Sequence, residues 1–149
     1  MNWIKMKTMV CLTLILGLVS CSVYKYVPEG ERLLNKVEVT SADRVVSDVT
    51  KYRNLSHQTP NSRWFGLFRF PLRMYSLSGK RTGEAPVIYD QLLSEASCAD
   101  MERSLINSGY LNADVTMSTR NGRRPKTTVR YKLNPGKMFV VDTDRKSVV

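Results

Sequence analysis

The sequence is poor in the residue types on which most catalytic and metal chemistry depends. Its 149 residues include three cysteines and a single histidine, His57. No cysteine–histidine cluster has metal-ligand spacing, and neither a glycine-rich phosphate loop nor a G-x-S-x-G motif is present. His57 stands beside Ser56 in a polar stretch, which is typical of a surface residue rather than a general base. The sequence therefore predicts no enzyme, no catalytic residue, no cofactor and no metal site.

Acidic residues are also scarce. The chain has 13 aspartates and glutamates but 23 lysines and arginines, which gives a formal net charge of +10 at pH 7. In a cytosolic protein such an excess indicates a nucleic-acid partner. Anionic lipid head groups, acidic protein surfaces or a merely solvated basic surface are the other interpretations.

Hydrophobic runs long enough to span a membrane are missing as well. The apolar run Met9–Val19 has eleven residues, whereas a spanning helix needs about 20. Lys5 and Lys7 precede this run, and no acidic residue occurs before Glu29, a pattern typical of a secretory signal. The run ends in Leu18-Val-Ser-Cys21, which resembles the lipobox of bacterial lipoproteins. An ordinary secretory signal followed by a chance cysteine is the alternative.

The lipobox resemblance implies that residues 1–20 are a signal peptide and that Cys21 is the lipid-attachment residue. Cleavage would lower the net charge from +10 to +8, and export excludes nucleic acid as a partner. Two or more acyl chains, such as palmitate, give stable anchoring. The segment 22–28 lacks the acidic stretch of surface-exported lipoproteins, so we expect the chain to face the periplasm. Cys98 then has no partner for an internal disulfide and is interpreted as a half-buried helix residue.

The first half of the remaining chain predicts a tether, a strand and a helix. Residues 21–30 form the tether, which ends in the turn signal Pro28-Glu-Gly30. Apolar and polar residues alternate over Glu31–Thr40, which predicts a strand. Asp43 is a candidate N-cap for a helix in which apolar residues recur at helical spacing up to Tyr52.

Residues 54–83 lack regular periodicity and are interpreted as an insertion. Its segment Arg63–Tyr75 holds five aromatic residues and three arginines. One interpretation is an interfacial or partner-binding element, because aromatic and arginine side chains suit both settings. The other, which Pro71 favours because it interrupts a continuous amphipathic helix, is that these side chains pack onto the domain.

The second half predicts a helix followed by a hairpin. Ser97-Cys-Ala-Asp100 resembles a capping box and predicts the start of the helix, and Gly109 is placed to end it. Apolar residues alternate with polar ones over Asn112–Thr119 and again over Thr127–Leu133. Between these strands lies Asn121-Gly122, a strong hairpin signal, within a loop rich in basic residues. That loop, 120–126, is interpreted as solvated, with contact to phosphate head groups as the alternative.

The element order predicts an α+β fold in which two helices cover one face of a small three-stranded sheet. This order resembles a POTRA (polypeptide-transport-associated) domain. The segments Cys21–Val39, 83–90, Asn107-Ser-Gly-Tyr-Leu-Asn-Ala-Asp-Val115 and 129–136 resemble the opening module of BamA/TamA-family lipoproteins of Bacteroidetes, often called TamL. The resemblance implies a mixed sheet and a POTRA-like domain over residues 31–136 with its insertion at about 54–83. Because family members continue into further modules and a membrane barrel, residues 137–149 are interpreted as the start of a truncated next module and the chain as a fragment.

The resemblance also implies a function and a location. The chain is expected to be a lipid-anchored binding module of the outer membrane that serves outer-membrane protein assembly or translocation. It would hold unfolded client strands, or a periplasmic or inner-membrane partner, by pairing at a sheet edge. The candidate edges are Glu31–Thr40 and Thr127–Leu133. The alternative is a small stand-alone structural lipoprotein that tethers a partner to the outer membrane.

Overall fold

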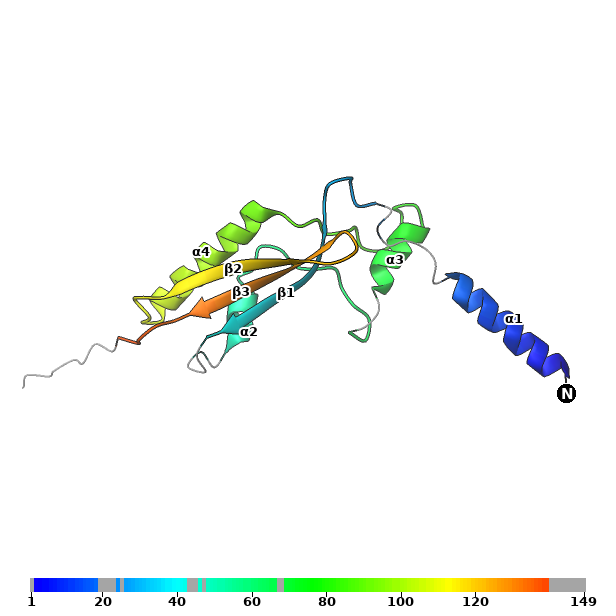
Figure 1. Cartoon of the computed structure of the whole chain (residues 1–149), viewed down its shortest axis with the longest axis horizontal. Helices are drawn as coiled ribbons and strands as arrows, with labels where there is room; N and C mark the ends of the chain where they lie inside the picture. The colour runs from blue at the N-terminus through cyan, green and yellow to red at the C-terminus, as the bar shows by residue number, and fades with distance from the viewer. Residues whose placement is uncertain are drawn as a thin grey trace, which may run out of the picture. The chain divides into compact units, whose positions relative to one another are not determined.

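The computed structural model describes residues 2–18, 24, 26–42, 46, 48–66 and 69–139, and divides the chain into two compact units. The first unit, Met1–Glu29 with Asn61–Pro86, carries two helices, α1 (Asn2–Leu18) and α3 (Phe70–Leu77). The sheet unit is Gly30–Pro60 with Val87–Val149. Its elements, in chain order, are β1 (Leu33–Ser41), α2 (Val49–Arg53), α4 (Gln91–Asn107), β2 (Asp114–Asn121) and β3 (Lys126–Asn134) (Figure 1).

Helix α1 covers most of the segment interpreted as a signal peptide. Among the helices of the described residues, none combines the length and the apolar content that a membrane span requires. Cys21, the predicted lipid-attachment residue, lies outside the described residues.

The three strands form one mixed sheet in the order β1-β3-β2. β3 lies in the centre, parallel to β1 and antiparallel to β2. A parallel pair needs a crossover connection of a dozen or more residues, and the chain between β1 and β3 provides it. The fold is therefore α+β with a three-stranded mixed sheet, as the sequence predicts.

The antiparallel pair β2–β3 is the hairpin predicted from Asn121-Gly122. Its loop is closed by the Gly122 N–H, which donates to the Lys126 carbonyl at 2.9 Å. The Thr127 hydroxyl donates to Asn121 Oδ1 at 2.8 Å and ties the two strand ends together. The hairpin prediction is confirmed.

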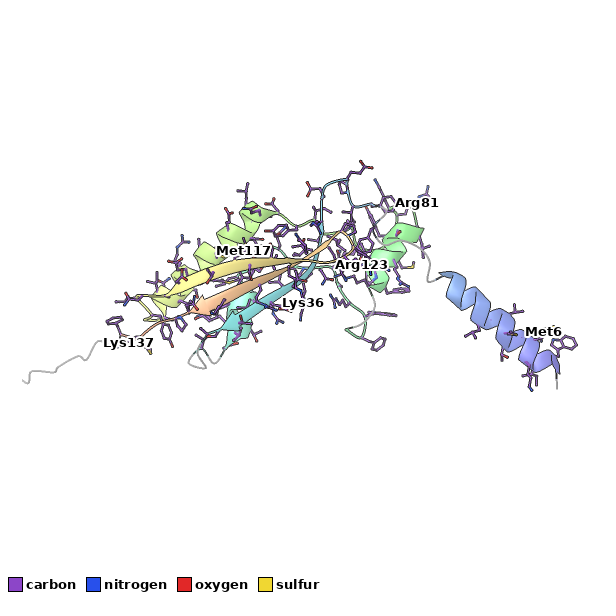
Figure 2. The ribbon with its side chains drawn as sticks, viewed as in Figure 1. Met6, Lys36, Arg81, Met117, Arg123 and Lys137 are labelled. Carbon is purple, nitrogen blue, oxygen red and sulfur yellow. The ribbon has the colours of Figure 1, made fainter. Side chains whose placement is uncertain are left out.

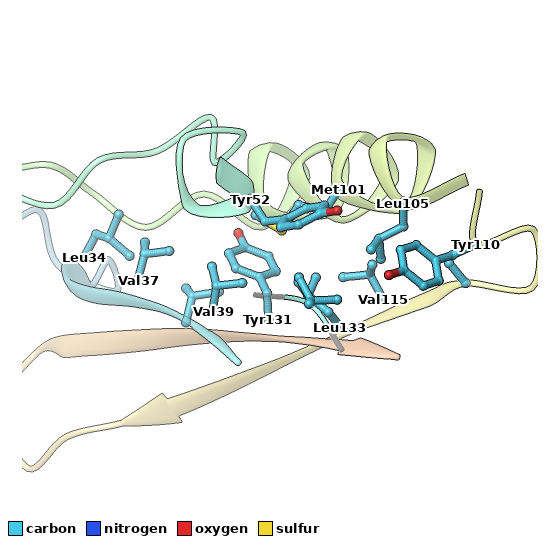
Figure 3. Close-up of a cluster of buried hydrophobic side chains, with 13 residues drawn as sticks. Leu34, Val37, Val39, Tyr52, Met101, Leu105, Tyr110, Val115, Tyr131 and Leu133 are labelled. Carbon is cyan, nitrogen blue, oxygen red and sulfur yellow. The ribbon is translucent and has the colours of Figure 1, made fainter. Parts of the chain in front are cut away.

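The core lies between one face of the sheet and the helices α2 and α4 (Figure 3). Alternation along β3 turns Val129, Tyr131 and Leu133 toward this layer, where each is at most 1% exposed. Tyr52 reaches it from α2, and two fully buried side chains reach it from α4. Those two are Met101 and Leu105. One apolar face on each element thus assembles a single core.

Helix α4 begins earlier than the sequence pattern predicts. Asp90 is its N-cap, with Oδ1 accepting from the N–H groups of Leu92 at 2.8 Å and Leu93 at 3.3 Å. The prediction of a start at Ser97 is therefore wrong. Ser97 lies about two turns further along. It is fully buried, and its hydroxyl donates to the Leu93 carbonyl at 2.7 Å. Gly109, with φ of +96°, follows the C-cap and confirms the predicted end of the helix.

Helix α2 is short and begins later than predicted. Its N-cap is Asp48, whose carboxylate accepts from the N–H groups of Thr50 and Lys51 at 3.1 and 3.3 Å. Asp43, the predicted cap, lies outside the described residues. Tyr52 is buried as the helical spacing predicts.

In the first unit, Pro71 does not interrupt a helix but stands in the first turn of α3. Proline is tolerated there because the first N–H groups of a helix have no partner within it. Gly83 packs against this helix with φ of +112°, and a Cβ at this position would lie 2.5 Å from the Tyr75 backbone nitrogen. Only glycine therefore allows the chain to approach α3 so closely.

Three aromatic side chains of the segment Arg63–Tyr75 are exposed. Trp64 stacks on Phe70 with ring centroids 5.1 Å apart, and Phe65 is 89% exposed. The expectation that the aromatic side chains of Arg63–Tyr75 pack onto the domain is therefore wrong for these three side chains. Leu72, in contrast, is 1% exposed and forms the buried side of α3.

Substitutions of two leucines on α4 test the position of the core. Leu105→Ala removes a fully buried side chain and is expected to lower the free energy of unfolding by about 2–5 kcal/mol. Leu92→Ala is the matched control, because this side chain is 75% exposed on the same helix. Chemical denaturation followed by circular dichroism measures both. Equal losses for the two variants would contradict this core.

Candidate binding surfaces

The sheet unit has two edge strands. Only one of them was expected from the sequence. β3 pairs on both sides, so the candidate edge Thr127–Leu133 is wrong. Its alternation resembles that of an edge strand only because one face of the sheet is exposed to solvent. The edges are β1, which was expected, and β2.

One hydrogen bond and the strand register establish which residues of β2 direct their backbone N–H and C=O groups away from β3. The Ala42 N–H donates to the Leu133 carbonyl at 2.9 Å, so Leu133 directs its backbone groups toward β1. Successive residues of a strand point to opposite neighbours, so Lys132 and Arg130 bond to β2. Their partners there are Thr116 and Ser118. The intervening residues of β2 therefore direct their N–H and C=O groups outward, namely Val115, Met117 and Thr119.

The outer edge of β1 is partly covered. At its start the Leu34 N–H donates to the Val87 carbonyl, and the Tyr89 N–H donates to the Arg32 carbonyl, both at 2.8 Å. Leu33 also forms an isolated bridge with Ile88. The segment 87–89 thus occupies the edge where a further strand would begin to pair.

The outer edge of β2 has no such cover. Among the residues that the structure describes, no backbone group outside β3 bonds to Val115, Met117 or Thr119. Thr119 is exposed, Met117 is half-buried and Val115 faces the core. β2 therefore offers a row of unpaired donors and acceptors, which is the feature that templates strand addition.

The face of the sheet opposite the core is polar and basic. Glu38 of β1 lies at its centre, where Oε2 accepts from Arg130 Nε at 3.0 Å and Nη2 at 2.8 Å. Its other oxygen, Oε1, lies 2.9 Å from Lys36 Nζ. Hydrogen bonds from Lys36 and Arg130 hold the pKa of the Glu38 carboxyl below its ordinary value. Neither cation was singled out from the sequence, because their juxtaposition depends on the pairing of β1 with β3.

The basic hairpin expected to be a solvated loop lies at one end of this face. Arg120 and Arg123 are exposed, and Lys126 is half-buried. These three residues line a hollow of about 420 Å³ together with residues of β1 and β3. The loop is therefore not isolated in solvent but forms one wall of a concave basic surface.

His57 is a surface residue, as predicted, but it is anchored. Its Nε2 lies 2.8 Å from Asp100 Oδ2, and Arg103 Nη1 donates to the other oxygen of that carboxylate at 3.0 Å. The His57 backbone N–H donates to Ser97 Oγ at 3.0 Å. These contacts fasten the loop after α2 to α4, and a separation of 43 residues hides them from local sequence patterns.

Gln58 is a buried polar residue for which the sequence predicted no role. It is 8% exposed, and its Nε2 donates to the Ile88 carbonyl at 3.0 Å. Its Oε1 accepts from the Asp90 N–H at 3.2 Å and from the Ser94 hydroxyl at 3.4 Å. Gln58 thus holds the entry to α4 in place. Nothing in its polar surroundings in the sequence distinguishes it from an exposed residue.

The remaining candidates show no reactive arrangement. Cys98 is partly buried beside the core, and burial raises the pKa of its thiol, which disfavours the reactive thiolate. Within the described part of the chain, no group of three or more histidine, cysteine, aspartate or glutamate side chains is placed to hold a metal ion.

Comparisons with protein families, curated proteins and solved structures found no match to the chain. The resemblance carried by the sequence motifs therefore stays a prediction.

The Glu38 cluster makes a prediction about pH. Its pKa is lower in the folded chain than in the unfolded chain, where it is about 4.3. The ionised carboxylate therefore stabilises the fold above the unfolded pKa, and this contribution is lost as the pH falls through the folded pKa. NMR titration should find a Glu38 pKa below the ordinary value, and Lys36→Met should raise it. An unchanged pKa in that variant would exclude Lys36 as the main cause.

Proposed function

We propose that the sheet unit binds an extended segment of another protein, which adds as a further strand beside β2. The observation that carries this proposal is the uncovered outer edge of β2, with outward backbone groups at Val115, Met117 and Thr119. Outward groups at every second residue match the spacing at which an added strand offers its own.

The chemistry of this edge favours many partners over one. Main-chain hydrogen bonds supply affinity without requiring a particular sequence. Thr116 and Ser118, on the solvent side of β2, have small polar side chains that require little of a partner's sequence. An edge of this kind suits unfolded or extended segments of varied sequence.

In its finer form, the proposal is that the unit is a POTRA-like module of an outer-membrane protein assembly or translocation lipoprotein. The motif resemblances to the BamA/TamA family support this form, and so does the order strand, helix, helix, strand, strand within the sheet unit. The partners would be unfolded outer-membrane protein clients or a periplasmic or inner-membrane assembly protein. The chain would be held at the outer membrane by acyl chains on Cys21 and would face the periplasm.

A pair of substitutions at Thr119 tests strand addition. Thr119→Pro removes one outward N–H, and because that group makes no bond to β3, the sheet should stay intact. Thr119→Val is the matched control, since it keeps both the N–H and the β-branched shape. Photocrosslinking from β2 to an outer-membrane protein diluted from urea should fall several-fold in Thr119→Pro alone.

Circular dichroism establishes that both Thr119 variants are folded. Equal crosslinking by folded Thr119→Pro and Thr119→Val would contradict pairing at β2.

Lipid labelling in a bacterial cell tests the anchor. The full chain should incorporate radiolabelled palmitate, and Cys21→Ala should abolish the incorporation because the thiol and the new amine that carry the acyl chains are both lost. Cys98→Ala is the control and should label as the wild type does. Labelling of Cys21→Ala at the wild-type level would refute attachment at this residue.

A further inference from the structure

The solvent face of the sheet is hollowed at the hairpin end. The hollow has a volume of about 420 Å³ and is lined by all three strands and by the loop between β2 and β3. Figure 2 labels two of its residues, Lys36 on β1 and Arg123 in the hairpin loop. Its volume falls in the range of small-molecule sites. The charged residues that line it are Lys36, Glu38, Arg120, Arg123, Lys126 and Arg130.

These side chains leave the hollow strongly positive. Five cations face one carboxylate, that of Glu38, which is paired with Lys36 and Arg130. Within the described part of the chain, no carboxylate lies within 4 Å of Arg120, Arg123 or Lys126. A concave surface with uncompensated charge of one sign concentrates the potential and attracts a counter-ion.

The Glu38 carboxylate holds two of the cations, Lys36 and Arg130, in place before any ligand arrives. Glu38 Oε2 accepts two N–H groups of Arg130, which fixes the plane of that guanidinium. Gly122 leaves room for the Lys126 side chain, since a Cβ there would lie 2.8 Å from Lys126 Cε and 2.9 Å from Cγ. Groups that are already oriented lose less entropy on binding.

We propose that this hollow is a binding site for a phosphate-bearing ligand. Arginine presents a planar set of N–H donors that matches two phosphate oxygens at once, and lysine adds a point charge. The excess of cations suits a group with more than one negative charge or several neighbouring phosphates. None of the residues that line the hollow is aromatic, so bases have no stacking surface there. This favours a head group or a small phosphate compound over single-stranded nucleic acid.

The site is independent of the proposed strand addition. The outward groups of β2 point away from the sheet within its plane, whereas the hollow opens on its solvent face. Substitutions in the hairpin loop therefore test phosphate binding without removing any outward N–H of β2.

Two charge-matched double variants of the full chain test the proposal. Arg123→Gln with Lys126→Gln removes two cations of the hollow. Lys132→Gln with Lys137→Gln removes two exposed cations outside it, one of them on the same strand, β3. The soluble probe is inorganic diphosphate, followed by calorimetry. The membrane probe is co-sedimentation with phosphatidylcholine vesicles that contain or lack phosphatidylglycerol.

The hollow variant should bind about tenfold more weakly or worse, because charge-assisted hydrogen bonds are lost. The control should stay within about twofold at physiological salt, where distant charges are screened. This pattern with diphosphate identifies a soluble phosphate ligand, and with anionic vesicles it identifies lipid head groups. The proposal is overturned if both variants lose binding equally, if the wild type binds neither probe, or if an unstructured oligonucleotide binds more tightly than both.

Discussion

The pairing of β3 on both sides is the constraint on which the rest of the sheet unit depends. This strand joins β1, which lies far away in the sequence, to β2, which precedes it directly. Its inward side chains Val129, Tyr131 and Leu133 also form the floor on which α2 and α4 pack. Backbone pairing and side-chain burial therefore support each other in one strand. A break in β3 would separate β1 from the hairpin and open the core at the same time.

The position of β3 also decides where partners can reach the unit. Because β3 satisfies its backbone groups on both sides, unpaired groups occur only on the outer strands, and the segment 87–89 occupies the start of β1. The uncovered edge is left to β2. On the solvent face, the same pairing brings Arg130 beside Glu38 and closes the hollow between β1 and the hairpin. An edge in the plane of the sheet and a basic face above it can thus serve two ligands of different chemistry.

Predictions from the sequence failed in two situations. Either the tertiary structure did not follow a local motif, or the contact joined residues far apart in the chain. Ser97 was the expected cap of α4, but Asp90 caps the helix, and Ser97 is fully buried within it, where its hydroxyl donates to the Leu93 carbonyl. Pro71 is locally typical of a helix breaker, but α3 tolerates it because the helix begins at Phe70, which places the proline in the first turn. Gln58 and the contact of His57 with Asp100 leave no local signal, because their partners lie 30 to 43 residues away.

The features that could be predicted from the sequence are those that depend on neighbours along the chain. These are the alternation of the three strands, the hairpin at Asn121-Gly122, the end of α4 at Gly109 and the α+β class. Hydrophobic periodicity, turn residues and helix capping each depend on a few consecutive residues, so they can be predicted from the sequence. The fold alone establishes the strand order, the open edge at β2 and the grouping of Lys36, Glu38 and Arg130 with the hairpin cations. Each of these depends on the parallel pairing of β1 with β3, a long-range contact that no local pattern encodes.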